Sequence, residues 1–118
     1  MNSQKVHFLI DFTINEFDDF AATVKIMTER TTKEPGALEY EWFLGKDHRR
    51  CRLVEIYANV EAMQAHLAGT VVQELVPKLL SFATVNRFEV YGQPDAQSAA
   101  VLASFGAEIY PHWQGLRK

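Results

Sequence analysis

The order in which strand-like and helix-like apolar patterns follow one another restricts how this chain can fold. Residues 6–12 alternate apolar and polar side chains, as a strand with one buried face does. Asn15 is predicted to cap a helix, because apolar residues then recur every three or four positions from 17 to about 32. Two further strand-like segments, 37–44 and 51–58, flank a polar turn and predict a hairpin.

The second half of the chain completes this pattern. Asn59 is a suitable N-cap for a short helix that Gly69 ends, and an apolar helical piece containing Pro77 follows. Residues 84–91 alternate again and predict a fourth strand. The resulting order, βαββαβ, is that of the ferredoxin-like α+β fold.

Size and composition are those of one globular domain: 118 residues, of which 47% are hydrophobic and 23% charged. We expect residues 1–94 to form the ferredoxin-like domain and residues 95–118 to add a helix and a tail that pack on it. The N-terminal stretch lacks the pattern of a signal peptide, and no apolar run approaches the length of a membrane span. We therefore expect a cytoplasmic protein that does not bind a membrane.

The net charge of the chain and its few cysteines and histidines argue against several classes of function. Fifteen acidic and twelve basic residues give a net charge of −3, whereas binding to nucleic acid requires a concentrated positive surface. The single cysteine, Cys51, excludes an internal disulfide framework, and no basic helix terminus beside it activates its thiol. The four histidines, at positions 7, 48, 66 and 112, lack the short spacing of metal ligands, so no metal site is predicted.

The predicted strands carry apolar side chains on both faces. In the third strand, Leu53 and Tyr57 lie on one side, whereas Val54 and Ile56 lie on the other, where Phe43 of the second strand is expected to join them. The helices can cover only one face of such a sheet. We therefore expect a homodimer in which two copies pack sheet against sheet.

Three features together carry a resemblance to a known family. A Pro-Gly turn at 35–36 leads into an aromatic strand, Glu55 precedes Tyr57 by two positions, and a helix carries His66 followed by leucine. These segments resemble the antibiotic biosynthesis monooxygenase (ABM) family, and within it the small bacterial quinol monooxygenase-like members. The likeness extends over about residues 6–91. It implies a dimeric α+β barrel with a pocket between the sheet and the helices of each protomer.

The resemblance also implies a chemistry. Relatives with known activity oxygenate electron-rich phenolic or quinol compounds without metal, flavin or haem. Haem-degrading relatives carry a histidine in the segment that corresponds to residues 71–82, where this chain has none. The implied reactants are therefore a small aromatic molecule and dioxygen, with no cofactor.

Two titratable residues, His66 and Glu55, are the candidate catalytic groups. Glu55 lies in the middle of an apolar strand, where a carboxylate is unfavourable unless it is paired or faces a cavity. It either acts as a base or orients His66, or it is a structural residue that is satisfied by an arginine such as Arg52 or Arg87 or reaches solvent at the sheet edge. His66 borders the apolar face of its helix and is either a buried structural histidine or a general base at a cavity.

Three aromatic residues, Tyr40, Trp42 and Tyr57, are the candidate substrate-binding residues. They occupy neighbouring strands and could form the walls around a flat ring, with plain core packing as the alternative. The resulting hypothesis is a cofactor-independent monooxygenase. The alternatives are an isomerase that acts on a small oxo-compound through His66 and Glu55, and a non-catalytic ligand-binding or stress-linked module. A requirement for dioxygen distinguishes the first from the second, and binding without turnover indicates the third.

Overall fold

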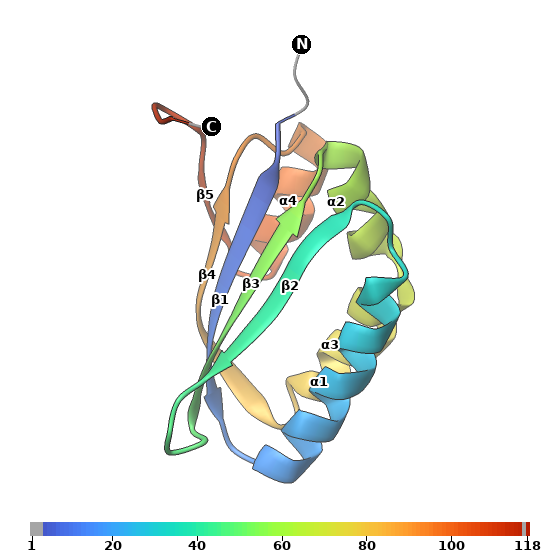
Figure 1. Ribbon diagram of the computed structural model, residues 1–118, viewed down its shortest axis with the longest axis vertical. Helices are drawn as coiled ribbons and strands as arrows, with labels where there is room; N and C mark the ends of the chain where they lie inside the picture. The colour runs from blue at the N-terminus through green and yellow to red at the C-terminus, as the bar shows by residue number, and fades with distance from the viewer. Residues whose placement is uncertain (1–3, 117) are drawn as a thin grey trace.

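A five-stranded sheet with helices on one face forms the framework of the computed structural model, which describes residues 4–116 and 118 (Figure 1). The strands are β1 (Val6–Ile14), β2 (Ala37–Leu44), β3 (Arg50–Tyr57), β4 (Ala83–Tyr91) and β5 (Glu108–Tyr110), in the spatial order β2-β3-β1-β4-β5. Strands β1 to β4 pair antiparallel, and β5 lies parallel to β4. The predicted ferredoxin-like α+β fold is confirmed.

The helices are α1 (Phe17–Thr32), α2 (Val60–Ala68), the π-helical turn η1 (Val71–Leu75), α3 (Val76–Leu79) and α4 (Ala96–Ser104). Asn59 caps α2 as predicted, since its side chain accepts a hydrogen bond from the backbone of Ala62. The predicted cap at Asn15 is wrong, because α1 begins after Glu16 and the Asn15 side chain bonds Thr84 instead. No helix in the described residues is both long and apolar enough to span a membrane.

Strand alternation decides which side chains face the helices. On β3, Cys51, Leu53, Glu55 and Tyr57 are buried on this inner face, while the residues between them point to the outer face. The register of the sheet places Glu55 between Phe8 of β1 and Tyr40 of β2. The inner face therefore carries one carboxylate in the middle of its apolar core.

The C-terminal segment continues the same packing. Leu102 of α4 is fully buried against a core cluster that includes Val6, Phe8 and Met63. Strand β5, which the sequence patterns do not predict, extends the sheet beyond β4. The chain then runs out into solvent, where Trp113 is 89% exposed.

The outer face of the sheet carries both apolar and charged groups and no helix (Figure 1). Leu9, Val54 and Ile56 lie half-buried along its centre, and Phe43 of β2 is 57% exposed. Asp11 is buried in the same face, with its Oδ2 atom 2.9 Å from Arg50 Nη2. This face is the surface on which a second copy was expected.

Candidate active site

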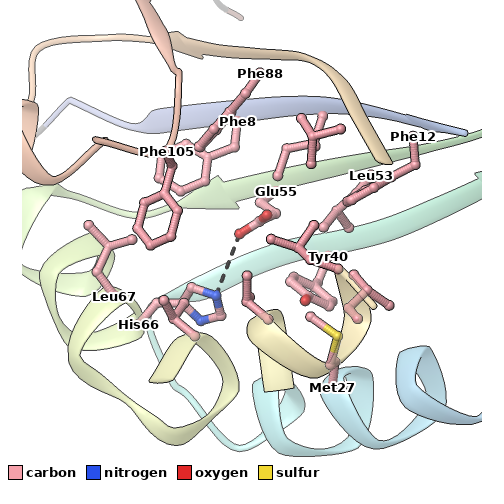
Figure 2. Close-up of a pocket in the computed structure, with 16 residues that line it drawn as sticks. Phe8, Phe12, Met27, Tyr40, Leu53, Glu55, His66, Leu67, Phe88 and Phe105 are labelled. Carbon is pink, nitrogen blue, oxygen red and sulfur yellow. Dashed lines mark ion pairs between the residues drawn. The ribbon is translucent and has the colours of Figure 1, made fainter. Parts of the chain in front are cut away.

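A cavity of about 100 Å³ lies between the inner face of the sheet and the helices (Figure 2). An apolar cavity of roughly 150 Å³ can hold benzene, so this space is of the size that a single aromatic ring requires. Almost all of the lining is apolar, and its polar groups belong to Tyr40, Glu55 and His66. The apolar side chains come from both layers and include Phe8, Phe12, Met27, Leu53, Leu67, Phe88 and Phe105.

Glu55 enters this cavity from the sheet. Its Oε1 atom accepts a hydrogen bond from the Tyr57 hydroxyl and lies 3.6 Å from Nε2 of His66 (Figure 2). Burial raises the pKa of the Glu55 carboxyl, because an apolar environment disfavours its charged form. The positive charge of His66, when its ring is protonated, and the hydrogen bond from Tyr57 oppose this effect. A carboxyl whose pKa is raised binds a proton more readily than an exposed one, which suits it to acid–base chemistry.

The alternative in which Arg52 or Arg87 satisfies Glu55 is wrong. Arg52 lies 3.9 Å from Asp11, and Arg87 lies 3.4 Å from Glu89. Both pairs are formed by residues that point to the outer face of the sheet, opposite to Glu55.

His66 enters the cavity from α2, opposite Glu55. The ring is buried, and its Nδ1 atom lies 2.9 Å from Oε1 of Glu34. The rings of Tyr57 and Tyr40 lie 5.1 Å and 5.9 Å from it, between centroids. Glu55 and His66 thus approach one pocket, Glu55 from the sheet and His66 from the helix.

The three aromatic candidates occupy different places. Tyr40 lines the cavity, and its hydroxyl is buried without a hydrogen-bond partner in the described residues. Burial and the nearby Glu55 hold its pKa well above the usual value, so this hydroxyl stays a donor. Trp42 and Tyr57 lie behind the lining instead. Trp42 stacks on Phe12 and donates to Thr28, and Tyr57 is fully buried against Glu55.

Sequence reasoning missed two residues of the site, Glu34 and Phe105. Glu34 lies in the loop before β2, and only its position before the Pro35-Gly36 turn could have drawn attention to it. Phe105 follows α4 and closes one side of the cavity near Leu67 (Figure 2). No sequence spacing relates Phe105 to the strands, since α4 reaches the cavity only through tertiary packing.

The Cys51 thiol and possible metal ligands are the remaining chemical groups to consider. Burial raises the pKa of the Cys51 thiol to about 11, with a contribution from Asp11, so the thiol remains protonated as expected. Within residues 4–116 and 118, no group of three or more His, Cys, Asp or Glu side chains is arranged to hold a metal ion.

Comparison with known proteins identifies the family. The family model described as "Antibiotic biosynthesis monooxygenase" (ABM) matches residues 4–78, which is more than half of the chain. The chain belongs to the ABM family. Glu34, Glu55 and His66 all lie inside the matched segment of this ABM protein, whereas Phe105 lies outside it.

Solved structures share the fold of this ABM protein at low sequence identity. MupZ from Pseudomonas fluorescens is 22% identical, with a TM-score of 0.82 over 98% of this chain and 96% of MupZ. SnoaB from Streptomyces nogalater, a cofactor-independent oxygenase, is 14% identical, with a TM-score of 0.67 over 80% of this chain and 97% of SnoaB. Protein SO0527 from Shewanella oneidensis is 23% identical, with a TM-score of 0.62 over 75% and 88% of the two chains. Among curated proteins, no significant match is found.

Proposed function

We propose that this ABM protein is a cofactor-independent monooxygenase that acts on a small phenolic or quinol compound. The observation that carries the proposal is Glu55, a carboxyl with a raised pKa in an otherwise apolar cavity, beside His66. The ABM family and the fold shared with SnoaB, a cofactor-independent oxygenase, support it. Among the described residues that line the cavity, His66 is the only basic side chain, which favours a neutral ring over an anionic substrate.

The chemistry follows from the properties of a phenol. Glu55 or His66 accepts the phenolic proton, and the resulting phenolate is electron-rich enough to reduce dioxygen directly. A phenol with a free para carbon then becomes a quinone, because one oxygen atom is retained and the other leaves as water with the two hydrogens of the substrate. The substrate supplies all the electrons. The Tyr40 hydroxyl lies close to the Thr31 side chain but forms no hydrogen bond of good geometry within the described residues, so it can donate one to a substrate oxygen.

Dioxygen consumption tests the proposal. Purified protein, treated with chelator, is expected to consume dioxygen with members of a panel of one-ring phenols and hydroquinones. Glu55→Gln and His66→Gln should each lower turnover at least about 100-fold, the usual contribution of an acid–base group. Glu61→Gln, at an exposed position on α2, is the matched control and should retain activity. Activity that requires added flavin, iron or haem would contradict the proposal.

A second candidate, an isomerase for a small oxo-compound, is favoured by the arrangement of Glu55 and His66. The two groups face one cavity from opposite layers, so one can remove a proton from a carbon while the other returns a proton elsewhere. Turnover or deuterium exchange under strictly anaerobic conditions identifies this activity. Ligand binding with no turnover in either assay indicates a binding module.

We also propose that two copies form a homodimer through the outer face of the sheet. Leu9, Val54 and Ile56 form an apolar strip on this face that no helix covers. Oδ1 of Asp11 is buried there without a hydrogen-bond partner in the described part of the chain, although Oδ2 is paired with Arg50. A partner subunit could supply the missing donor. A cytoplasmic location stays a prediction from the sequence.

A further inference from the structure

Glu34 reaches His66 because the turn at Pro35 and Gly36 packs tightly against α2. A Cβ atom at Gly36 would lie 2.3 Å from the Cβ of Ala62, so only a residue without a side chain allows this approach. Ala62 and His66 are four positions apart and therefore lie on the same face of the helix. The turn that rests on Ala62 thus holds Glu34 over the His66 ring.

The two nitrogens of the His66 ring have different surroundings. Nδ1 lies 2.9 Å from Oε1 of Glu34, which is a hydrogen-bonding distance. Nε2 lies 3.6 Å from Oε1 of Glu55, which is too long for a hydrogen bond. The Glu34 side chain is 27% exposed, whereas the His66 and Glu55 side chains are 3% and 5% exposed. A partly solvated carboxylate is thus in contact with one side of a buried ring, and the cavity lies on the other side.

We propose that Glu34 is a positioning residue: it holds the proton of the neutral His66 ring on Nδ1, so that the unprotonated Nε2 faces Glu55 and the cavity. A ring nitrogen with a hydrogen-bond acceptor at 2.9 Å keeps its proton, and this determines the role of the other nitrogen. The same division of roles places a carboxylate behind the base in many acid–base sites.

The consequence for catalysis rests on the function proposed above. When Glu55 takes a proton from the substrate and the two side chains close from 3.6 Å to hydrogen-bonding distance, Nε2 of His66 can accept that proton from Glu55, and the ring becomes a cation. The Glu34 carboxylate, still bonded to Nδ1–H, stabilises this cation, as a carboxylate does behind a catalytic histidine. The titratable groups that face the ring are Glu34 in the loop, Tyr40 on β2, and Glu55 and Tyr57 on β3.

Nuclear magnetic resonance tests the placement of the proton without any substrate. The ¹⁵N chemical shifts of the two ring nitrogens distinguish a protonated nitrogen from an unprotonated one, and the spectrum of His66→Gln assigns the signals. In the wild-type protein the neutral ring should carry its proton on Nδ1. In Glu34→Ala the proton should move to Nε2, because Glu55 is then the nearest acceptor. Glu34→Gln should retain the wild-type form, since its amide oxygen still accepts the bond.

A wild-type ring with its proton on Nε2, a ring that stays protonated on both nitrogens, or an unchanged ring in Glu34→Ala would overturn the proposal. Glu61→Gln, which removes an exposed carboxylate from α2, should leave the ring unchanged. With a substrate in hand, Glu34→Ala should lower kcat about 10- to 100-fold with little change in KM, and Glu34→Gln should recover part of the loss. If no substrate is turned over, the proposed function fails while the ring measurement still decides the role of Glu34.

Discussion

Burial of the Glu55 carboxyl links the stability of this fold to pH. Because its pKa is raised in the folded state, the folded chain binds this proton more tightly than the unfolded chain does. The stabilisation from proton binding is therefore complete below the ordinary pKa of 4.5 and is lost as the pH rises through the folded-state pKa. Glu55 thus lowers the free energy of unfolding in the pH range where it is charged.

Glu55→Gln is expected to remove this pH-dependent loss, because an amide stays neutral and still accepts a hydrogen bond from Tyr57. The melting temperature of the variant relative to wild type should rise as the pH increases above 4.5 and level off once the pH has passed the folded-state pKa of Glu55. Each unit by which the pKa is raised corresponds to about 1.4 kcal/mol. Glu61→Gln, which removes an exposed carboxylate, is the control, and its melting temperature relative to wild type should change little with pH. A difference for Glu55→Gln that stays constant with pH would contradict the prediction.

The Tyr57 hydroxyl offers a second measurement on the same carboxyl. Its hydrogen bond lowers the pKa of Glu55, so Tyr57→Phe should raise that pKa further and move the pH dependence of turnover to higher pH. The lost hydrogen bond should also reduce stability by about 1–2 kcal/mol. Tyr91→Phe is the matched control, because Tyr91 donates to Glu89 in the same two-residue relation at the surface. If the pH profile of turnover is unchanged in Tyr57→Phe, ionisation of Glu55 does not control the rate-limiting step.

At the scale of single residues, the sequence predicts the candidate groups better than their partners. A carboxylate inside an apolar strand and a histidine at the edge of an apolar helix face are visible in the pattern. Strand alternation alone could have excluded Arg52, which is three positions from Glu55 and points to the opposite face. Glu34 could not be found in this way, because its contact depends on how closely a loop approaches α2.

At the scale of secondary-structure elements, the contact between the Pro35-Gly36 turn and α2 positions the site. Gly36→Ala is expected to lower stability by about 1–3 kcal/mol, because the new methyl group would overlap the Cβ of Ala62. The displaced turn should also break the bond between Glu34 and His66, visible in the ring ¹⁵N shifts. Adding Ala62→Gly should restore that bond, although glycine inside a helix itself costs about 1 kcal/mol. Failure of the double variant to restore it would mean that the turn does not position Glu34.

The elements themselves were largely predictable, and the exceptions have physical reasons. Helices and strands of eight or more residues show a clear apolar period, and the four main strands and helices α1, α2 and α4 were predicted at nearly their observed positions. Strand β5 has three residues, too few to show a period, and exists because it pairs with β4. The start of α1 differed because Asn15 bonds across to β4 rather than to its own helix.

At the scale of the whole molecule, the outer face of the sheet is a surface that no helix of the chain covers. The half-buried Leu9, Val54 and Ile56 lie next to one another on adjacent strands, with the exposed Phe43 at one side. Arg50 and Arg52 surround Asp11 on the same face, so a second copy would meet both apolar and charged groups. An interface between two such faces would be isologous, with each residue contacting the matching surface of its partner.

Ile56→Glu tests this interface, because the variant places one carboxylate at the centre of the apolar strip on each of the two subunits, where pairing of the two faces would bury it. Wild-type protein should show about twice the chain mass of 13.5 kDa in light scattering at micromolar concentration. Ile56→Glu should shift this value to the monomer while retaining its circular dichroism spectrum. Val101→Glu, an equally drastic change at an exposed position on α4, should remain a dimer. A monomeric wild-type protein, or a dimer that Ile56→Glu leaves intact, would place any partner on another surface.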